Sequence, residues 1–236
     1  MLWLFVKAPF ATFRSFTAGA YRPTAPFITP SAAYGLVLNL GGIESRFDDG
    51  RSSMTETAPH LPRVEMALGA LLIPEAQTTY QQLHNYPVGA TGKDRKGDAK
   101  GTKYNIQPIR REFLSRIEAY VCLRGSADLE ARVRAAIGGA PSAGATPRYG
   151  IPFLGDNSFM VDVLREETER RPAHWYRRLS SGEGAVAGRC RLSVWIDRGD
   201  MTRTRTAIYA PVYPAVSTIP EEAWTVIEPT MEIGIT

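Results

Sequence analysis

The chain has 236 residues, 44% of them hydrophobic and 22% charged, a composition typical of a globular protein with room for one substantial core. Its net charge of +4 at pH 7 weakly favours an anionic partner. Two cysteines are too few for a disulfide framework or a zinc knuckle, and no apolar run approaches the roughly 18–20 residues that span a bilayer, so we expect a protein of the reducing cytoplasm with no membrane partner.

The first elements expected from the sequence are a strand and a helix joined by an unusual loop. Residues 2–7 alternate as a strand does, with Leu2, Leu4 and Val6 on one face. A helix is expected from Pro30, after a Thr29 that can cap it, and is ended by Gly41-Gly42. The loop between them is rich in phenylalanine, proline and arginine, which is unusual for a simple connection.

The middle of the chain predicts a long hairpin. Residues 63–75 read as a strand, although their periodicity also allows a helix, and residues 105–125 contain a return segment and a second strand. Between these lies the stretch 89–103, with four glycines and five basic residues against two acidic ones. Such a stretch cannot be buried, so we expect it at an exposed tip.

The remaining elements complete an α+β pattern. A second helix is expected between Ser126, which can cap it, and Gly138, and strand-like segments follow at 150–165, 189–197 and 202–214. The order is that of a ferredoxin-like β-α-β-β-α-β domain, the sheet on which RNA-recognition modules stack bases. We therefore expect such a domain over 1–148, and the last strand with a β-rich C-terminal extension over 149–236.

Conventional catalysis and cofactor binding find little support. No phosphate loop or dinucleotide fingerprint is present, and the three histidines, His60, His84 and His174, lie far apart in the sequence. We expect no cofactor, no metal and no small-molecule substrate. The clearest chemistry in the chain is contact with a polyanion.

Three segments are candidates for that contact, each with a structural alternative. Arg14 between Phe13 and Phe16 suits stacking of bases with a phosphate contact, but these phenylalanines could instead pin the loop to the core while Arg14 pairs internally. Thr29 and Ser31 lie at a helix start, where N–H groups attract anions, although every helix has such an end. The basic tip suits nucleic acid, or is simply a solvated loop.

The opening loop also resembles a known family. The stretches "PFATFRSF" and "RPTAPFITPSAAYGLVLNLGGIE", about forty residues in all, look like the N-terminal signature of the CRISPR-associated, RAMP-type Cascade subunits that cap the 5′ handle of the guide RNA (crRNA) in type I systems, the Cas-five family. The later segment "RYGIPFLGDNSF" is similar to a second element of that family. From residue 45 onward the likeness is mostly architectural, and the last 80 residues match poorly.

The resemblance implies an RNA-binding subunit in a ribonucleoprotein complex for antiviral defence or RNA-guided targeting. Its expected partners are the crRNA 5′ handle, the Cascade backbone and large subunits, and target DNA near the PAM end. A hairpin "thumb" is expected at about 78–104. The candidate RNA-binding residues of the body are Lys7, Thr12, Phe13, Arg14, Arg22, Thr29, Ser31, Tyr34, Arg110, Arg111 and Arg148. Those of the thumb are Tyr80, Gln82, His84, Tyr86, Lys93, Arg95, Lys96, Lys100, Lys103 and Tyr104.

Whether the protein cuts RNA is a separate question. One branch of the family processes precursor crRNA with a tyrosine and an adjacent lysine and histidine, a set that this sequence lacks. We therefore expect a binder without catalytic residues. The alternative is a metal-independent endoribonuclease that uses His84, Tyr86 or Tyr104 and Lys103. Residues 174–178 and 202–206 could be RNA or partner surfaces, or simply solvated strand faces.

Overall fold

The computed structural model describes residues 1–14, 21–48, 50, 55–84, 106–139, 151–198 and 200–229, and the side chains of 83, 84, 106 and 107 are not described. Its elements, in chain order, are β1 (Leu2–Ala11), β2 (Tyr21–Arg22), α1 (Pro30–Leu40), β3 (Arg46–Phe47), β4 (Glu56–Thr57), β5 (Val64–Leu72), β6 (Glu75–His84), β7 (Ile106–Arg124), α3 (Ala127–Ile137), β8 (Val163–Glu166), β9 (His174–Arg178), β10 (Cys190–Trp195), η1 (Met201–Arg203), β11 (Arg205–Pro211), η2 (Glu221–Ala223) and β12 (Thr225–Ile227).

The centre of the molecule is a mostly antiparallel sheet in which β8, β1, β7 and β5 lie side by side in that order. The short β2 pairs with β7 in the parallel direction. Together with α1 and α3, this sheet gives the α+β class that the sequence predicts. Residues 64–72 form a strand, so the helical alternative for this segment is wrong.

The strand expected over 150–165 is wrong for most of its length, because only β8 is regular. Residues 151–162 form a folded loop in which Phe153 bridges Met160 and the Leu154 N–H donates to the Phe159 carbonyl at 2.9 Å. The Thr12 N–H in turn donates to the Leu154 carbonyl at 3.2 Å. These hydrogen bonds hold the loop across the end of β1. A straight strand through residues 151–162 would not form them.

Strand β1 separates two cores, as its alternating sequence predicts. Leu2, Leu4 and Val6 face the main core, which includes α1. Trp3 and Phe5 face the opposite side, where Tyr120 and Trp175 bury them to 5% exposure each. In an RNA-recognition module, this second side is the sheet face that stacks bases. In this protein the aromatic rings of Trp3 and Phe5 on that face are covered by other residues.

The cap residues expected for both helices are confirmed. The Thr29 hydroxyl accepts from the Ala32 N–H at 3.2 Å, Pro30 takes the first position of α1, and Gly41 follows its last. At α3 the Ser126 hydroxyl accepts from the Leu129 N–H at 3.4 Å. Local sequence therefore fixes where each helix begins.

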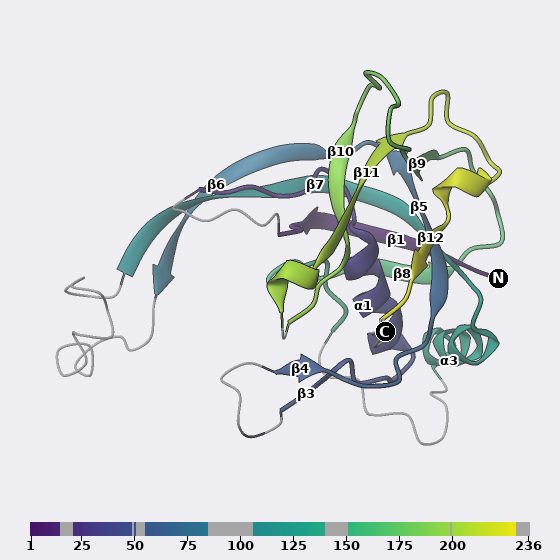
Figure 1. Cartoon of the computed structure of the whole chain (residues 1–236), viewed down its shortest axis with the longest axis horizontal. Helices are drawn as coiled ribbons and strands as arrows, with labels where there is room; N and C mark the ends of the chain where they lie inside the picture. Colours follow the sequence, from purple (N-terminus) through teal and green to yellow (C-terminus); the bar gives the residue numbers. More distant parts are fainter. Residues whose placement is uncertain are drawn as a thin grey trace, which may run out of the picture.

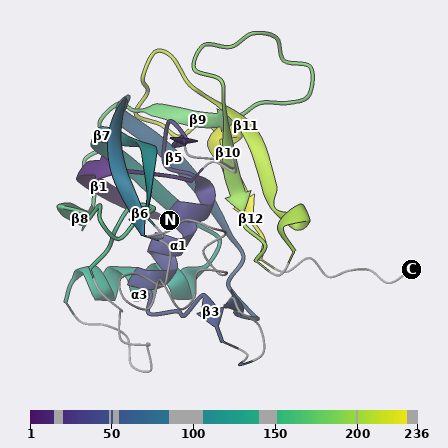
Figure 2. The ribbon, with the colours of Figure 1, turned by 90° about the vertical axis from the view of Figure 1, so that its left-hand side faces the viewer.

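The C-terminal strands extend the same sheet and curve it around α1. β5 pairs with β9 and β12 on its free edge, and β11 and β10 continue beyond β9. In Figure 2, α1 lies between the β1–β7 side and the β10–β11 side. Phe27, at the end of the aromatic loop, stacks on Tyr176 of β9 with centroids 4.2 Å apart, so the loop joins both sides.

The predicted long hairpin is formed by β6 and the first half of β7. Their pairing runs from Glu75 opposite Ser115 to His84 opposite Ile106, and the ribbon extends away from the body in Figure 1. The expected basic tip lies outside the described residues. Among the residues that are described, none of the helices is both long and apolar enough to span a membrane.

Candidate nucleic-acid interface

The aromatic loop is tied to β7 through one carboxylate. Glu112 accepts hydrogen bonds from the Tyr21 hydroxyl and, at 3.1 Å, from the Thr24 N–H. Two further bonds connect the ends of the loop: the Phe13 N–H donates to the Thr24 hydroxyl at 2.9 Å, and the Ala25 N–H donates to the Phe13 carbonyl at 2.8 Å. The position of residue 14, directly after Phe13, is therefore fixed.

The structure separates the two roles that the sequence left open for this loop. Phe13 is 2% exposed and Phe27 fully buried, so both phenylalanines pin the loop to the core and neither ring is open to a base. Arg14 is exposed, and no carboxylate among the described residues forms an ion pair with it. Phe16 lies outside the described ranges.

Two further arginines gather near Arg14. Arg46 begins β3 and Arg198 follows β10. Burial lowers the pKa of the Arg198 guanidinium, and the nearby positive charges of Arg46 and Arg14 lower it further. Within the described part of the chain, neither Arg46 nor Arg198 has a carboxylate in ion-pair contact. Three uncompensated cations held together favour the arrival of an anion.

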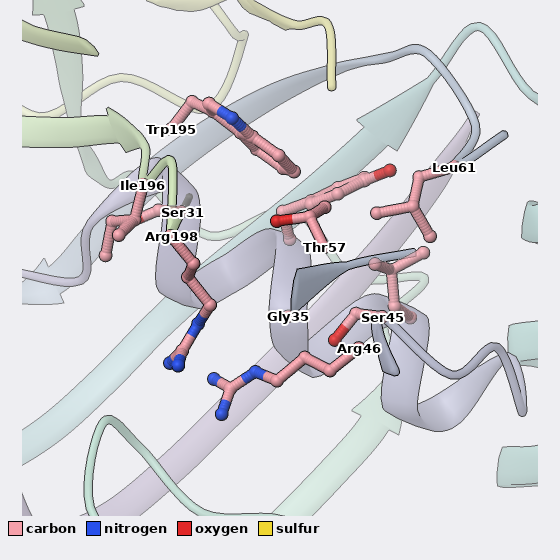
Figure 3. A pocket seen from close by; sticks show the side chains of 11 residues that line it. Ser31, Gly35, Ser45, Arg46, Thr57, Leu61, Trp195, Ile196 and Arg198 are labelled. Atoms are coloured by element: carbon pink, nitrogen blue, oxygen red, sulfur yellow. The ribbon is translucent and has the colours of Figure 1, made fainter. Parts of the chain in front are cut away.

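A pocket lies beside α1, with Arg46 and Arg198 in its lining (Figure 3). In the figure, the Arg46 and Arg198 side chains extend toward one another at one side of it. The residues that line the pocket are Ser31, Tyr34, Gly35, Leu38, Ser45, Arg46, Thr57, Leu61, Trp195, Ile196 and Arg198. The site thus combines cations, hydroxyl groups and aromatic surface.

The helix-start residues have different surroundings. Thr29 is 4% exposed, and its hydroxyl is occupied with capping Ala32. Ser31 is half-buried, lines the pocket, and has its Oγ 3.1 Å from that of Thr29. Tyr34 is buried, and its hydroxyl donates to the Pro62 carbonyl at 2.7 Å. Of these three predicted contacts, Ser31 is the one whose polar group faces the open site.

Other predicted residues of the body have protein partners. Thr12 is buried and donates to the Glu112 carbonyl at 3.1 Å. Lys7 pairs with Glu118 at 2.9 Å, and Arg111 pairs with Asp156 at 2.6 Å. These contacts hold the sheet and the base of the hairpin together, and they leave Thr12, Lys7 and Arg111 less free for RNA.

The accessible predicted residues continue along the hairpin. Arg110 is exposed and lies over the Tyr21 ring at 5.5 Å, while Arg22 of β2 is half-buried and pairs in register with Arg111. Across the hairpin from Arg110 is Tyr80, which is 78% exposed. Gln82 is also exposed. His84 ends β6 without a described side chain, and Arg148, Tyr86, Lys93, Arg95, Lys96, Lys100, Lys103 and Tyr104 lie outside the described residues.

Sequence reasoning missed Arg46, Trp195 and Arg198. Each lies in a short segment without a motif, and they meet only because the sheet curves around α1. In the described ranges, no group of three or more His, Cys, Asp or Glu side chains could hold a metal ion.

A mostly antiparallel sheet with two helices, beside a pocket whose lining includes Arg46 and Arg198, defines an α+β protein with a positively charged pocket. The chain belongs to the family described as CRISPR-associated protein (Cas_Cas5), whose model matches residues 1–194. No curated protein matches the chain.

One of two similar solved structures shares the fold, at low sequence identity. One described as "CRISPR RNA-guided surveillance complex" superposes with a TM-score of 0.54 at 15% identity, covering 91% of this chain and 90% of that one. Another, "Crystal structure of Cas protein", covers 96% of this chain and 94% of that one at 14% identity, with a TM-score of 0.44, too low to show a common fold.

Proposed function

We propose that this protein is a non-catalytic crRNA-binding subunit of a type I CRISPR surveillance complex, which recognises and caps the repeat-derived 5′ handle. The observation that carries the proposal is the cluster of Arg14, Arg46 and Arg198 beside the start of α1. Membership of the family and the likeness to a surveillance-complex structure support it.

The strand order β8-β1-β7-β5 with helices after β1 and β7 supports a ferredoxin-like, RRM-like description of the core. In this protein, however, the sheet face opposite α1 is covered around Trp3 and Phe5. The proposed RNA path therefore follows the arginine side of the molecule, where α1 and the opening loop lie, and avoids that sheet face.

The β6–β7 hairpin is the proposed thumb. Tyr80 and Arg110 lie opposite one another on it, and Arg110 also lies over the ring of Tyr21 in the anchored loop. This arrangement supplies stacking surface and charge along one route from the body onto the hairpin. The proposed partners are the neighbouring backbone and large subunits of a cytoplasmic complex, with target DNA near the PAM end as a further one.

The proposal is tested with labelled repeat RNA in EDTA, at several salt concentrations. We expect the full chain to shift the RNA without cutting it. Arg198→Ala should weaken binding roughly tenfold, because a charge-assisted contact is lost. The slope of log K against log salt should fall by about 0.7 for each phosphate contact removed from a single strand.

The matched control is Arg132→Ala, which removes a half-buried arginine from α3, where it pairs with Asp128. It changes the net charge equally and should leave binding nearly unchanged. Equal losses in both variants would show that the arginine cluster is not the site. A discrete cut in EDTA would replace the proposal with the metal-independent endoribonuclease.

A further inference from the structure

We propose that the pocket beside α1 accepts the base of one unpaired nucleotide, while Arg46 and Arg198 hold that nucleotide's phosphate. The inference rests on the proposed function, since it states which part of a bound RNA enters this site. According to this inference, the protein encloses the base of one nucleotide of the handle and not the bases of its neighbours.

The floor of the pocket is shaped for a flat ring. Gly35 is exposed on α1, and a Cβ added at this position would meet no atom within 4 Å. Ser31 and Leu38, about one turn before and after it, line the same pocket. A planar group can therefore lie directly on the helix backbone at Gly35. The side chain of a larger residue at position 35 would occupy the space of that planar group.

The wall of the pocket is aromatic and held in place. Trp195 is half-buried at the end of β10, with the buried Tyr34 ring packed at an edge-on angle of 63° and a centroid distance of 6.1 Å. The bond from the Tyr34 hydroxyl to the Pro62 carbonyl fixes that ring. The indole thus has a rigid support on one side, and its open part is available to stack on a base.

The rim supplies polar contacts of two kinds. Ser31, Ser45 and Thr57 bring hydroxyl groups that can donate or accept, so they suit the edge of more than one base. Arg46 and Arg198 lie together at one side of the opening (Figure 3), where a planar guanidinium suits a phosphate. The inference therefore places the base on the floor and the phosphate of the same nucleotide at this side of the opening.

This combination disfavours other anionic ligands. A free phosphate gains nothing from Leu38, Leu61 and Trp195, because an apolar wall offers an oxyanion no hydrogen bonds. A duplex keeps its bases stacked and paired, so none can enter the pocket. An unpaired strand offers both the ring and the phosphate.

The test is an abasic scan of the handle RNA, measured by fluorescence anisotropy with the full-length wild type and with Gly35→Leu. In the wild type, removing the base at one position should weaken binding about tenfold, within the range for stacking of one base on an aromatic side chain. Gly35→Leu fills the floor, so the same abasic RNA should bind it within about twofold of the intact RNA. Binding of intact RNA by Gly35→Leu should fall by a similar factor.

Ala131→Leu is the matched control, because it adds a side chain of the same size at an exposed position of the other helix, α3, outside the pocket. It should bind intact RNA as the wild type does and still show the one sensitive position. Thermal unfolding of the three proteins checks that each is folded. If the wild type binds the handle but the scan is flat, or if Gly35→Leu keeps the sensitive position, the pocket inference is wrong and the proposed function stands. If the wild type does not bind the handle, both are wrong.

Discussion

Arg46 of β3 and Arg198, which follows β10, extend toward one another, and no described carboxylate forms an ion pair with either. Burial lowers the pKa of the Arg198 guanidinium, and the positive charges of Arg46 and Arg14 lower it further. The free protein therefore holds like charges near one another, with no ion pair to them from a carboxylate in the described part of the chain. This relationship distinguishes a binding surface from a structural ion-pair network.

Arg198→Ala should separate affinity from stability. Removing one of three repelling cations should leave the free energy of unfolding within about 0.5 kcal/mol of the wild type, or above it. RNA affinity should nevertheless fall. Thermal unfolding of the free protein beside a binding titration measures both, and a protein that becomes clearly less stable would show that Arg198 has a structural role instead.

Glu112→Gln should weaken RNA binding although it removes a negative charge. Loss of an acidic group near a polyanion site would ordinarily strengthen binding, but Glu112 anchors Tyr21 and Thr24 and thereby positions Arg14. Glu112→Ala should also lower the free energy of unfolding by about 1–3 kcal/mol, because the Thr24 N–H loses its acceptor. Urea unfolding and RNA titrations of both variants check this; tighter binding by Glu112→Gln would contradict the anchoring role.

The ion pair at the base of the hairpin should make stability depend on pH. Burial alone would raise the Asp156 pKa, but hydrogen bonds from Arg111 and Ser158 outweigh it and the pKa is lowered. A carboxyl with a depressed pKa stabilises the fold above its ordinary value near 4, and that contribution is lost as the pH falls below it. Asp156→Asn should cost roughly 1–3 kcal/mol at pH 7 and much less near pH 3. Urea unfolding of both proteins at pH 7 and pH 3 measures this cost. If the difference in free energy of unfolding were the same at both pH values, the ion pair would not make stability depend on pH.

Gly155 should be intolerant of any side chain. Its φ is +79°, and a Cβ would lie 1.7 Å from the Thr12 carbonyl oxygen. Gly155→Ala should therefore destabilise the protein by more than about 2 kcal/mol. Gly35→Ala, with open space and helical backbone, should be neutral or stabilising. Calorimetry on the two alanine variants gives the comparison, and equal melting temperatures would show that the 151–162 loop relaxes without penalty.

Local sequence was enough to predict the regular elements that carry their own signals. The cap of α1 at Thr29 and the alternation of β1 follow from neighbours in the chain, and both are confirmed. The strand predicted over 150–165 was wrong for most of its length because the apolar residues of this segment lie in a loop. Leu154 is buried against the end of β1, while Phe153 and Met160 remain exposed. Composition cannot distinguish that loop from a strand.

The candidate site was only partly predictable for a different reason. Ser31 was found because a helix start has a recognisable sequence. Arg46 and Arg198 have no such signal, and they meet only through the pairing of β5 with β9, which brings the C-terminal strands around α1. Phe13 shows the converse: an aromatic residue beside an arginine suggested stacking on RNA, yet its ring completes the core.

The pocket is assembled from parts of the chain that lie far apart in the sequence. Ser31 and Gly35 come from α1, whereas Trp195 and Arg198 come from the end of β10 and the segment after it. A substitution at 195 or 198 therefore alters one wall of the pocket and leaves the helix beneath it in place. The helix and that wall are encoded in separate stretches of the chain.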